Sequence, residues 1–272
     1  MIFAPEALAA YWRRIGIAAP SEPDRAALAA IVAAHTARIP FEGLDPLMGR
    51  AVDLAPDALA AKLLTGGRGG FCFEHNLILK SALEAVGFIV TGLAARVLWY
   101  APPGTVTPRT HMALLVDLPG GPAIVDAGFG GNVLTGVLDL VADIEQKTPH
   151  EPFRLIRDGD YWVQQVSIAG EWLPTYRFTL EPQAEIDYQL PSWYMSTSPK
   201  SHFVFGLTCS ITPPGRRLAL RNFDYSIHHS GGATERRRLG SAAEICDVIE
   251  REIGIAIPDR SALCRRIDEG LS

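Results

Sequence analysis

The amino-acid sequence predicts an α+β fold in which helices come first, strands follow and helices return at the end. Residues 1–87 carry apolar side chains mostly at helical spacing, punctuated by prolines and caps. From Phe88 the pattern changes to short runs rich in β-branched and aromatic residues, separated by Pro- and Gly-containing turns. Such turns favour hairpins over βαβ crossovers, so we expect an antiparallel barrel or a curved sheet.

The composition is that of an ordinary globular protein, with 48% hydrophobic and 20% charged residues among 272. The net charge of −5 and the absence of a long basic run argue against nucleic-acid binding. We interpret the one short Arg run, residues 236–238, as a solvated loop, with contact to a phosphate-bearing ligand as the alternative. No signal-peptide pattern and no apolar run of membrane-spanning length occurs, so we expect a cytoplasmic protein without a membrane partner. The four cysteines lack paired spacing, and we expect neither disulfides nor a metal site.

Three helices are expected before the central glycine-rich loop. The first has an apolar face within residues 8–15, and the second is an Ala-rich run from Asp24 to Ile39 that Pro40 ends. A short third helix is expected from Pro56 to Leu64, because proline suits the first helical position. We interpret His35, inside the second run, as a helix residue rather than a ligand.

A single cysteine follows two glycine pairs and opens the next expected helix. Gly66-Gly67 and Gly69-Gly70 precede Cys72, and an amphipathic run then continues to the stop signal Gly87. Cys72 therefore falls in a first helical turn, where unpaired N–H groups and the helix dipole favour a thiolate. Arg68 adds positive charge nearby. Because most cysteines are small buried hydrophobes, a reactive role for Cys72 depends on partners elsewhere in the chain.

Strands are expected through most of the remaining chain. They cover Phe88 to Tyr100, His111 to Leu118, Ala123 to Phe129, Phe153 to Ile156, Tyr161 to Ile168, Trp172 to Leu180, Phe203 to Ile211 and Arg217 to Leu220. The segment Pro119-Gly120-Gly121-Pro122 is a turn between the second and the third of these. At the end, the capping box from Ser241 to Glu244 opens a helix that Gly254 stops, and one more short helix runs from Pro258 through Ile267.

The hairpin around this turn carries a histidine on one strand and an aspartate on the other. A cysteine nucleophile needs a base, and the base needs an orienting partner. In an antiparallel pair of strands, the residue numbers of two facing residues always add up to the same sum. Any register in which this sum is odd places His111 and Asp126 on the same face of the sheet. Directly opposite pairing is one such register, and a symmetric turn would offset the two by four residues, so the register stays open. The apolar surroundings of Asp126 make an unpaired carboxylate costly.

Alternatives exist for each of these side chains. His75 lies three residues after the cysteine, on what can be the same helix face, and is the competing base. His202 is another candidate base. Asp126 could instead be an edge or turn aspartate bonded to the backbone. Glu74 and Asn76 could cap or support the start of the helix, and the pattern alone gives them no catalytic role.

The segment Arg68 to Asn76, RGGFCFEHN, resembles the active-site signature R-G-G-x-C-x-E-x-N of the arylamine N-acetyltransferases. The segments 110–112 and 125–131 resemble the histidine and aspartate segments of that family, and supporting matches run in order from about residue 39 to 205. One departure is Gly43, where the family pattern leads us to expect Asn, and it bears on the shape of the pocket edge.

The resemblance implies a cysteine-protease-like triad of Cys72, His111 and Asp126, with His111 rather than His75 as the base. It implies three regions: a helical bundle (1–87) carrying the cysteine, an antiparallel β-barrel (88–187) carrying the histidine and aspartate, and an α/β lid (188–272). It further implies site residues of two kinds. The acceptor slot is lined by Phe41, Val97, Phe129 and Phe203, and coenzyme A is admitted near the backbone by Gly128, Gly130 and Gly131. Each of the slot residues could otherwise be an ordinary core residue.

By the same resemblance, acetyl-CoA is the co-substrate and an arylamine or arylhydrazine is the acceptor. A ping-pong reaction passes through an acetyl thioester on Cys72, without a metal.

Other functions would fit the same residues. A different acyl transferase, an amide synthase or a thiol hydrolase would show the same triad, but it would form no stable acetyl-enzyme or would use a different donor. An inactive small-molecule binder would not need all three residues, and a zinc site at Cys72 and His75 lacks a second ligand pair. The sequence leaves open the natural acceptor, the acyl-chain preference, the contacts to the adenosine end of coenzyme A and whether the protein forms a homodimer.

Overall fold

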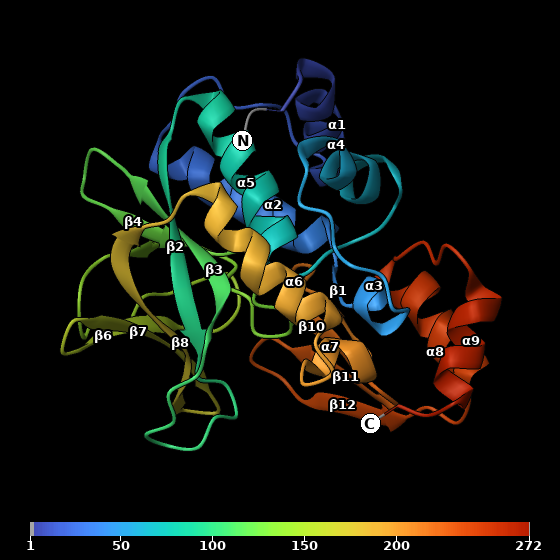
Figure 1. Cartoon of the computed structure of the whole chain (residues 1–272). Coiled ribbons are helices and arrows are strands. Elements are labelled where there is room, and N and C mark those ends of the chain that lie inside the picture. The colour runs from blue at the N-terminus through green and yellow to red at the C-terminus, as the bar shows by residue number, and fades with distance from the viewer. Residues whose placement is uncertain (1–2, 272) are drawn as a thin grey trace.

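The N-terminal third of the chain consists of helices packed around one buried helix, α5 (Figure 1). The computed structural model describes residues 3–271. The elements of this region are α1 (Pro5–Ile15), α2 (Arg25–Arg38), the short strand β1 (Phe41–Glu42), α3 (Leu44–Leu47), α4 (Pro56–Leu59), the π-helical turn η1 (Ala60–Thr65) and α5 (Cys72–Val86). Helix α5 contacts α1 and α2 on one side and β2 and β3 on the other, which buries every residue from Cys72 to Leu79.

The middle of the chain forms a seven-stranded antiparallel sheet in the order β5-β4-β3-β2-β8-β7-β6. Its strands are β2 (Ile89–Val97), β3 (Arg109–Asp117), β4 (Ala123–Val125), β5 (Leu138–Asp139), β6 (Phe153–Asp158), β7 (Tyr161–Ile168) and β8 (Glu171–Pro182). The two ends of the sheet meet where Gln146, beyond β5, exchanges two backbone hydrogen bonds with Phe153 of β6, at 2.8 and 3.0 Å. The sheet is therefore a nearly closed antiparallel barrel, and the predicted α+β fold is confirmed.

The remaining elements build a second sheet and a helical end. They are the 3-10 turn η2 (Glu185–Tyr188), α6 (Gln189–Thr197), α7 (His202–Phe205), β9 (Thr208–Ile211), β10 (Arg216–Arg221), β11 (Asp224–His229), β12 (Thr234–Arg238), α8 (Ala242–Asp247), the π-helical turn η3 (Val248–Ile253) and α9 (Arg260–Asp268). The sheet order is β1-β9-β10-β11-β12, with Phe41 of β1 opposite Ser210 of β9. This pairing joins the segment before the glycine loop to the C-terminal sheet. The domain boundaries near residues 87 and 187 stay a prediction.

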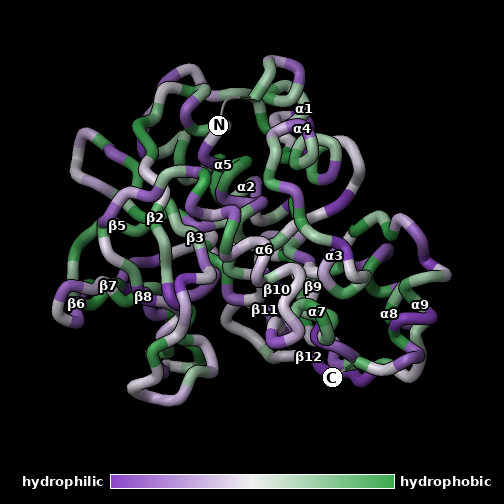
Figure 2. The backbone as a smooth tube through the Cα atoms, viewed as in Figure 1, coloured by the Kyte–Doolittle hydropathy of each residue, from purple (hydrophilic) through white to green (hydrophobic). Residues whose placement is uncertain are grey.

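Three clusters of buried apolar side chains form the core. The first joins the N-terminal helices to the barrel, the second lies between the C-terminal sheet, α3 and the last helices, and the third fills the barrel. Helix α5 is accordingly made up largely of hydrophobic residues, whereas strand β12 is hydrophilic (Figure 2). Cys246 belongs to the second cluster and Cys264 packs against it, as the sequence predicted.

Several segments differ from the sequence-based expectation. The expected strand from Ala123 to Phe129 ends at Val125, so Asp126 lies just beyond it. The expected strand from Phe203 begins instead as helix α7, because the Ser201 hydroxyl accepts the N–H of Phe203 as an N-cap and the strand starts only at Thr208. The Arg run 236–238, expected as a loop, lies in edge strand β12, which pairs with β11. Charged residues are suited to an edge strand because they discourage further pairing.

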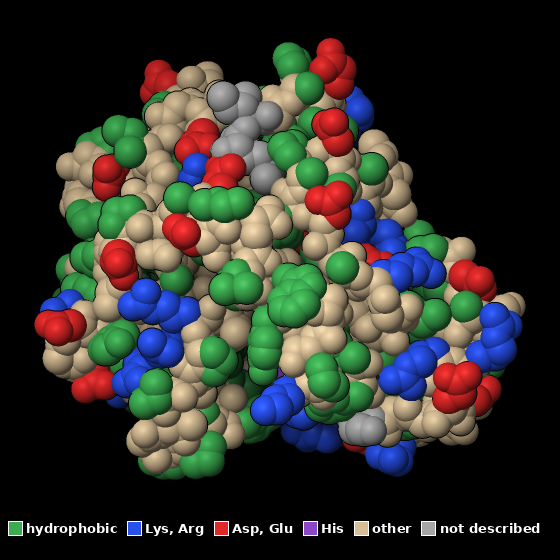
Figure 3. Space-filling view, viewed as in Figure 1, with side chains coloured by type: hydrophobic (Ala, Val, Ile, Leu, Met, Phe, Trp, Pro, Cys, Tyr) green, Lys and Arg blue, Asp and Glu red, His purple; other side chains and the backbone are tan. Residues whose placement is uncertain are grey.

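The surface mixes charges of both signs. On the face shown in Figure 3, Lys and Arg alternate with Asp and Glu and with apolar side chains. Within residues 3–271, no helix combines the length and the apolar character needed to cross a bilayer.

Candidate active site

The glycine loop leads into α5 through backbone groups that are already hydrogen-bonded. Three consecutive N–H groups donate to buried acceptors: Gly69 to Glu42 Oε1 at 2.9 Å, Gly70 to Pro40 O at 3.3 Å and Phe71 to Glu74 Oε2 at 2.9 Å. A Cβ at Gly69 would collide with Pro40 O, so this position requires glycine. Cys72 is the first residue of α5, as predicted, and within the described part of the chain its N–H has no protein acceptor.

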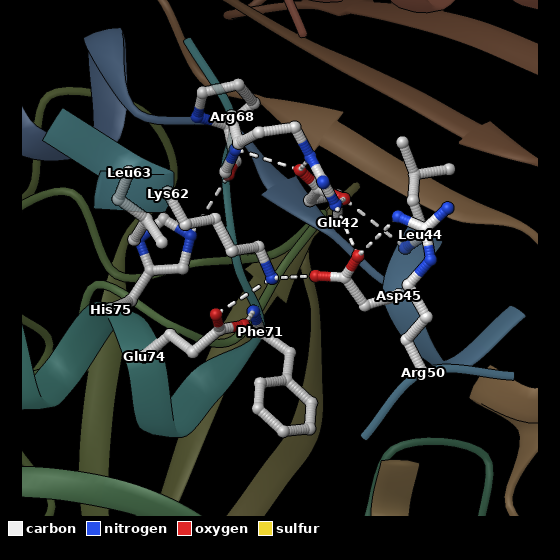
Figure 4. Close-up of polar contacts among 12 residues, drawn as sticks. Glu42, Leu44, Asp45, Arg50, Lys62, Leu63, Arg68, Phe71, Glu74 and His75 are labelled. Carbon is white, nitrogen blue, oxygen red and sulfur yellow. Dashed lines mark hydrogen bonds and ion pairs between the residues drawn. The ribbon is translucent and has the colours of Figure 1, made fainter. Parts of the chain in front are cut away.

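Arg68 is held beneath this loop rather than directed at the cysteine. Its guanidinium makes a two-pronged contact with Glu42, Nε to Oε1 and Nη2 to Oε2, both at 2.7 Å, and lies 3.2 Å from Asp45 (Figure 4). The side chain of Glu42 is fully buried and that of Arg68 nearly so. The positive charge that the sequence led us to expect beside Cys72 is therefore compensated, and the pair fixes the loop instead.

The strand register brings the predicted histidine and aspartate together. Leu114 of β3 lies opposite Val125, the last residue of β4, and Asp126 follows directly; extended by one residue, this register puts His111 and Asp126 on the same face with an offset of two residues. His111 Nε2 and Asp126 Oδ2 are 2.7 Å apart, and both side chains are buried. The predicted same-face relationship is confirmed.

Charge and burial act in opposite directions on this pair. Burial lowers the pKa of His111, but the charge and hydrogen bond of Asp126, together with contact to Cys72, outweigh it and raise the pKa to about 10. Burial likewise raises the pKa of Asp126, but the His111 charge and hydrogen bonds from His111, Asn76 and the Gly128 N–H outweigh it and lower the pKa. The pair is thus an imidazolium and a carboxylate at neutral pH.

Cys72 lies at the other side of the imidazole. Its Sγ is 3.6 Å from the carbonyl oxygen of Thr110, the residue before His111. Because Nε2 of His111 is bonded to Asp126, Nδ1 is the ring nitrogen left to face the thiol. Cys72 is 6% exposed, so the residue is almost completely enclosed.

Asn76 links the cysteine helix to both strands of the hairpin, a role that sequence analysis did not assign. Its Nδ2 donates to Met112 O at 2.8 Å and to Asp126 Oδ1 at 2.9 Å, and its Oδ1 accepts the N–H of Ala127 at 3.0 Å. The amide is completely buried. The available signal was its spacing of four residues from Cys72, which places both on one face of α5.

The two alternative bases are differently placed. His75 bonds through Nδ1 to His35 Nε2 at 2.9 Å and through Nε2 to Pro40 O at 3.1 Å, so neither ring nitrogen is left for Cys72. Burial lowers the pKa of His75 to about 4. The ring of His202 packs 4.1 Å from that of Phe203, and among residues 3–271 no hydrogen bond joins it to the cysteine or the aspartate.

The four predicted slot residues lie in three places. Phe41 and Phe203 lie beside the glycine loop, with ring centres 6.0 Å apart, and Phe203 also packs 5.9 Å from Phe71. Phe129 lies 5.3 Å from the ring of His111. Val97 is at the end of β2, paired with Tyr176.

Tyr176 is a further neighbour of the histidine that the sequence did not reveal. Its ring lies 4.8 Å from that of His111 and its hydroxyl donates to Gln164 Oε1 at 2.9 Å. Burial, followed by the charge of Asp126, raises its pKa well above the usual value, so the phenol stays neutral.

The glycines of the aspartate segment differ in what surrounds them. A Cβ at Gly128 would lie 2.6 Å from Cys72 Cα, so this glycine lets the segment pack directly on α5. Gly130 has a φ of +81° and lies against the ring of Phe41. A Cβ at Gly131 would meet only Ala219 Cβ, at 3.8 Å, so Gly131 has space beside it. In the described chain, no group of three or more His, Cys, Asp or Glu is placed to hold a metal ion.

Comparison with known proteins gives the family of this chain. A family model described as N-acetyltransferase matches residues 24–262. A relative named arylamine N-acetyltransferase, from Mycolicibacterium smegmatis, is 46% identical over 256 residues, covering 93% of each chain. A protein of the same name from Escherichia coli strain K12 is 37% identical, covering 92% of this chain and 89% of its own.

Solved structures share the whole fold. The arylamine N-acetyltransferase of Mycobacterium marinum superimposes with a TM-score of 0.93 at 40% identity, covering 97% of this chain and 100% of that one. A structure of the M. marinum protein in complex with CoA gives a TM-score of 0.93 at 39% identity, with the same coverage. Since the family model spans most of the chain and these relatives are aligned over nearly their full length, the protein belongs to the arylamine N-acetyltransferase family.

Proposed function

We propose that the protein transfers the acetyl group of acetyl-CoA to an arylamine or arylhydrazine through an acetyl thioester on Cys72. The observation that carries the proposal is the connected set of Cys72, His111 and Asp126, in which a charged imidazole lies between the thiol and a buried carboxylate. The names of the relatives and the CoA bound by one of them support the two substrates. The cytoplasmic location and the possibility of a homodimer stay predictions from the sequence.

In the first half-reaction, the Cys72 thiolate attacks the acetyl carbonyl carbon, an S–C bond to Cys72 forms and the S–C bond to coenzyme A breaks. The imidazolium of His111 stabilises the thiolate by its charge and then gives its proton to the departing CoA thiolate. The Cys72 N–H, which has no protein acceptor within the described residues and lies at the N-terminus of α5, can donate to the oxyanion of the tetrahedral intermediate.

In the second half-reaction, His111 is neutral and can act as a base. The acceptor nitrogen attacks the thioester carbonyl, its proton passes to His111, and the Cys72 thiolate leaves as the amide forms. Asp126 keeps Nε2 protonated throughout, so Nδ1 is the nitrogen that exchanges protons. Phe41, Phe129, Phe203 and Val97 would give the aromatic acceptor its apolar slot. Gly128, Gly130 and Gly131 would admit the pantetheine arm or the pyrophosphate of coenzyme A near the backbone.

The decisive experiment is intact mass spectrometry after mixing the protein with acetyl-CoA and no acceptor. We expect a gain of one acetyl group that is absent in Cys72→Ala and that an added arylamine removes with formation of its amide. A protein that consumes acetyl-CoA without any adduct, in wild type and under conditions of turnover, would instead indicate a hydrolase or another acyl donor.

A further inference from the structure

Five charged side chains lie together beneath the glycine loop, and a sixth, Arg50, reaches the edge of the cluster 3.9 Å from Asp45 (Figure 4). The five come from separate segments and comprise Glu42 of β1, Asp45 of α3, Lys62 of η1, Arg68 of the loop and Glu74 of α5. The charge of Glu42 is compensated by its two-pronged contact with Arg68. Glu74, the carboxylate on α5, is only 1% exposed and pairs with a different cation.

That cation is Lys62. Its Nζ is 2.8 Å from Glu74 Oε1 and 2.7 Å from Asp45 Oδ2, and its side chain is only 16% exposed. Burial lowers the pKa of Lys62, but the charges of Glu74, Glu42 and Asp45 outweigh it and raise the pKa, so the amine stays charged. An ammonium without these carboxylates would not be stable at such depth.

Glu74 connects this cation to the cysteine. While Oε1 binds Lys62, Oε2 accepts the N–H of Phe71 at 2.9 Å, one residue before Cys72. A Cβ at Gly70 would lie 2.7 Å from Oε2, so the carboxylate also occupies the space beside the loop. Moving this carboxylate would therefore free the Phe71 N–H and shift the backbone that presents Cys72.

Removal of Lys62 would leave Glu74 buried and unpaired. Burial already raises the pKa of Glu74, and the charge and hydrogen bond of Lys62 oppose that rise. The other charges facing it come from Glu42, which repels it, while Arg68 is occupied by Glu42 and Asp45. Without Lys62 the carboxylate would turn away toward water or take up a proton.

We propose that Lys62 is a positioning residue that holds the buried carboxylate of Glu74 against the N–H of Phe71 and thereby sets the position of Cys72. Lys62 acts through Glu74 and touches no substrate. The inference rests on the proposed role of Cys72 as the nucleophile, and it adds a requirement outside the triad.

The test compares Lys62→Met with Lys62→Arg and with Lys62→Met/Glu74→Gln. In the double variant, the amide oxygen of the new glutamine side chain can still accept the Phe71 N–H, and no carboxylate is left at that position without a cation. We expect single-turnover acetylation of Cys72 to be about 10- to 100-fold slower in Lys62→Met. A misplacement of a reacting group by about 1 Å can slow a reaction by about 100-fold. Lys62→Arg and the double variant should recover most of the rate. Lys147→Met, at an exposed lysine, is the control.

Thermal unfolding gives a second measurement that needs no acetyl-CoA. In Lys62→Met the folded state must either protonate Glu74 or displace its unpaired carboxylate toward water, and both cost more as pH rises above the usual Glu pKa of 4.5, so the Tm deficit relative to wild type should grow above that pH. In the Glu74→Gln background the deficit should not depend on pH. A Lys62→Met deficit that is the same at all pH values and is not reduced by Glu74→Gln would overturn the proposal. Failure of wild type to acetylate would count against the proposed function instead, and the unfolding series would still test the Lys62–Glu74 link.

Discussion

His35 and His75 share a hydrogen bond of 2.9 Å, from Nε2 of the first ring to Nδ1 of the second, in the buried interior of the helical region. The chain of bonds extends to Tyr11 OH, 3.0 Å from His35 Nδ1, and to Pro40 O, 3.1 Å from His75 Nε2. Because a carbonyl oxygen can only accept, His75 must carry its proton on Nε2. Burial lowers the pKa of both histidines, so both rings are neutral, and His35 Nε2–H and Tyr11 O–H are then the other two donors.

This neutral pair should make the protein sensitive to acid. Burial lowers the pKa of His75 to about 4 and that of His35 well below its usual value of 6.5. Between pH 6.5 and about 4 the unfolded chain binds protons that the folded chain does not, so the free energy of unfolding should fall by roughly 1 kcal/mol per pH unit for each histidine. Urea unfolding at pH 7 and pH 5 would measure this loss, and His35→Gln/His75→Gln should reduce it. An equal loss in the double variant would contradict the assignment.

Asp126→Asn should slow catalysis by orders of magnitude. Asparagine fills the same space, but its amide cannot hold the His111 imidazolium, and it can present an N–H that favours the wrong ring tautomer. We expect Cys72 acetylation to slow by about 10³- to 10⁴-fold, as for the equivalent change in a serine-protease triad. Single-turnover mass spectrometry would measure the rate. His75→Gln is the comparison, because a histidine that is not the base should lose much less, and an equal loss in both variants would reopen the choice of base.

The pairing of His111 with Asp126 should also make the stability of the protein depend on pH in the alkaline range. The pKa of His111 is raised to about 10 in the folded protein, against 6.5 when unfolded. Its contribution to stability is therefore complete below pH 6.5 and is lost as pH rises toward 10. The difference in free energy of unfolding between wild type and Asp126→Asn should shrink over this window. A difference that stays constant from pH 6.5 to 10 would show that His111 is not protonated in the folded state.

Gly128→Ala and Gly131→Ala should have separable effects. A Cβ at Gly128 would lie 2.6 Å from Cys72 Cα and 2.9 Å from Asn76 Nδ2, so alanine there must displace α5 from the hairpin. We expect a Tm drop of several degrees, consistent with an overpacking penalty of about 1–3 kcal/mol, together with slower acetylation. At Gly131 a Cβ has room, so the Tm should not change, and a raised KM for acetyl-CoA there would support the predicted role in admitting coenzyme A. Equal Tm values for the two variants would argue against the close packing of Gly128.

The sequence predicted those parts of the site that depend on short-range patterns. Glycine pairs followed by helical periodicity predicted that α5 starts near Cys72, and strand alternation predicted the shared face of His111 and Asp126 without the register. Contacts between distant segments carry no such pattern. Asn76 reaches Asp126 across 50 residues of sequence, and the His35–His75 bond spans 40. Helix α7, only four residues long, is too short to show a period.

Gly43, the one departure noted in the family pattern, has a structural explanation. A Cβ at Gly43 would lie 2.6 Å from Cδ1 of Phe203, so the absence of a side chain gives that ring its position. Phe203 in turn packs on Phe41 and Phe71 next to the cysteine loop. Glycine here therefore determines where one wall of the predicted acceptor slot stands.

Gly43→Asn should therefore change how the acceptor binds while leaving the first half-reaction intact. The new side chain must push the Phe203 ring away, whereas the Cys72–His111–Asp126 contacts are made by other elements. We expect the KM for an arylamine to change about threefold or more, since even one methylene in an apolar pocket is worth about 1–3 kcal/mol. The rate of Cys72 acetylation should stay within about twofold. Gly120→Asn, where no atom lies within 4 Å of the Cβ position, is the control. Slower acetylation with an unchanged acceptor KM would show that Phe203 supports the cysteine loop rather than the acceptor.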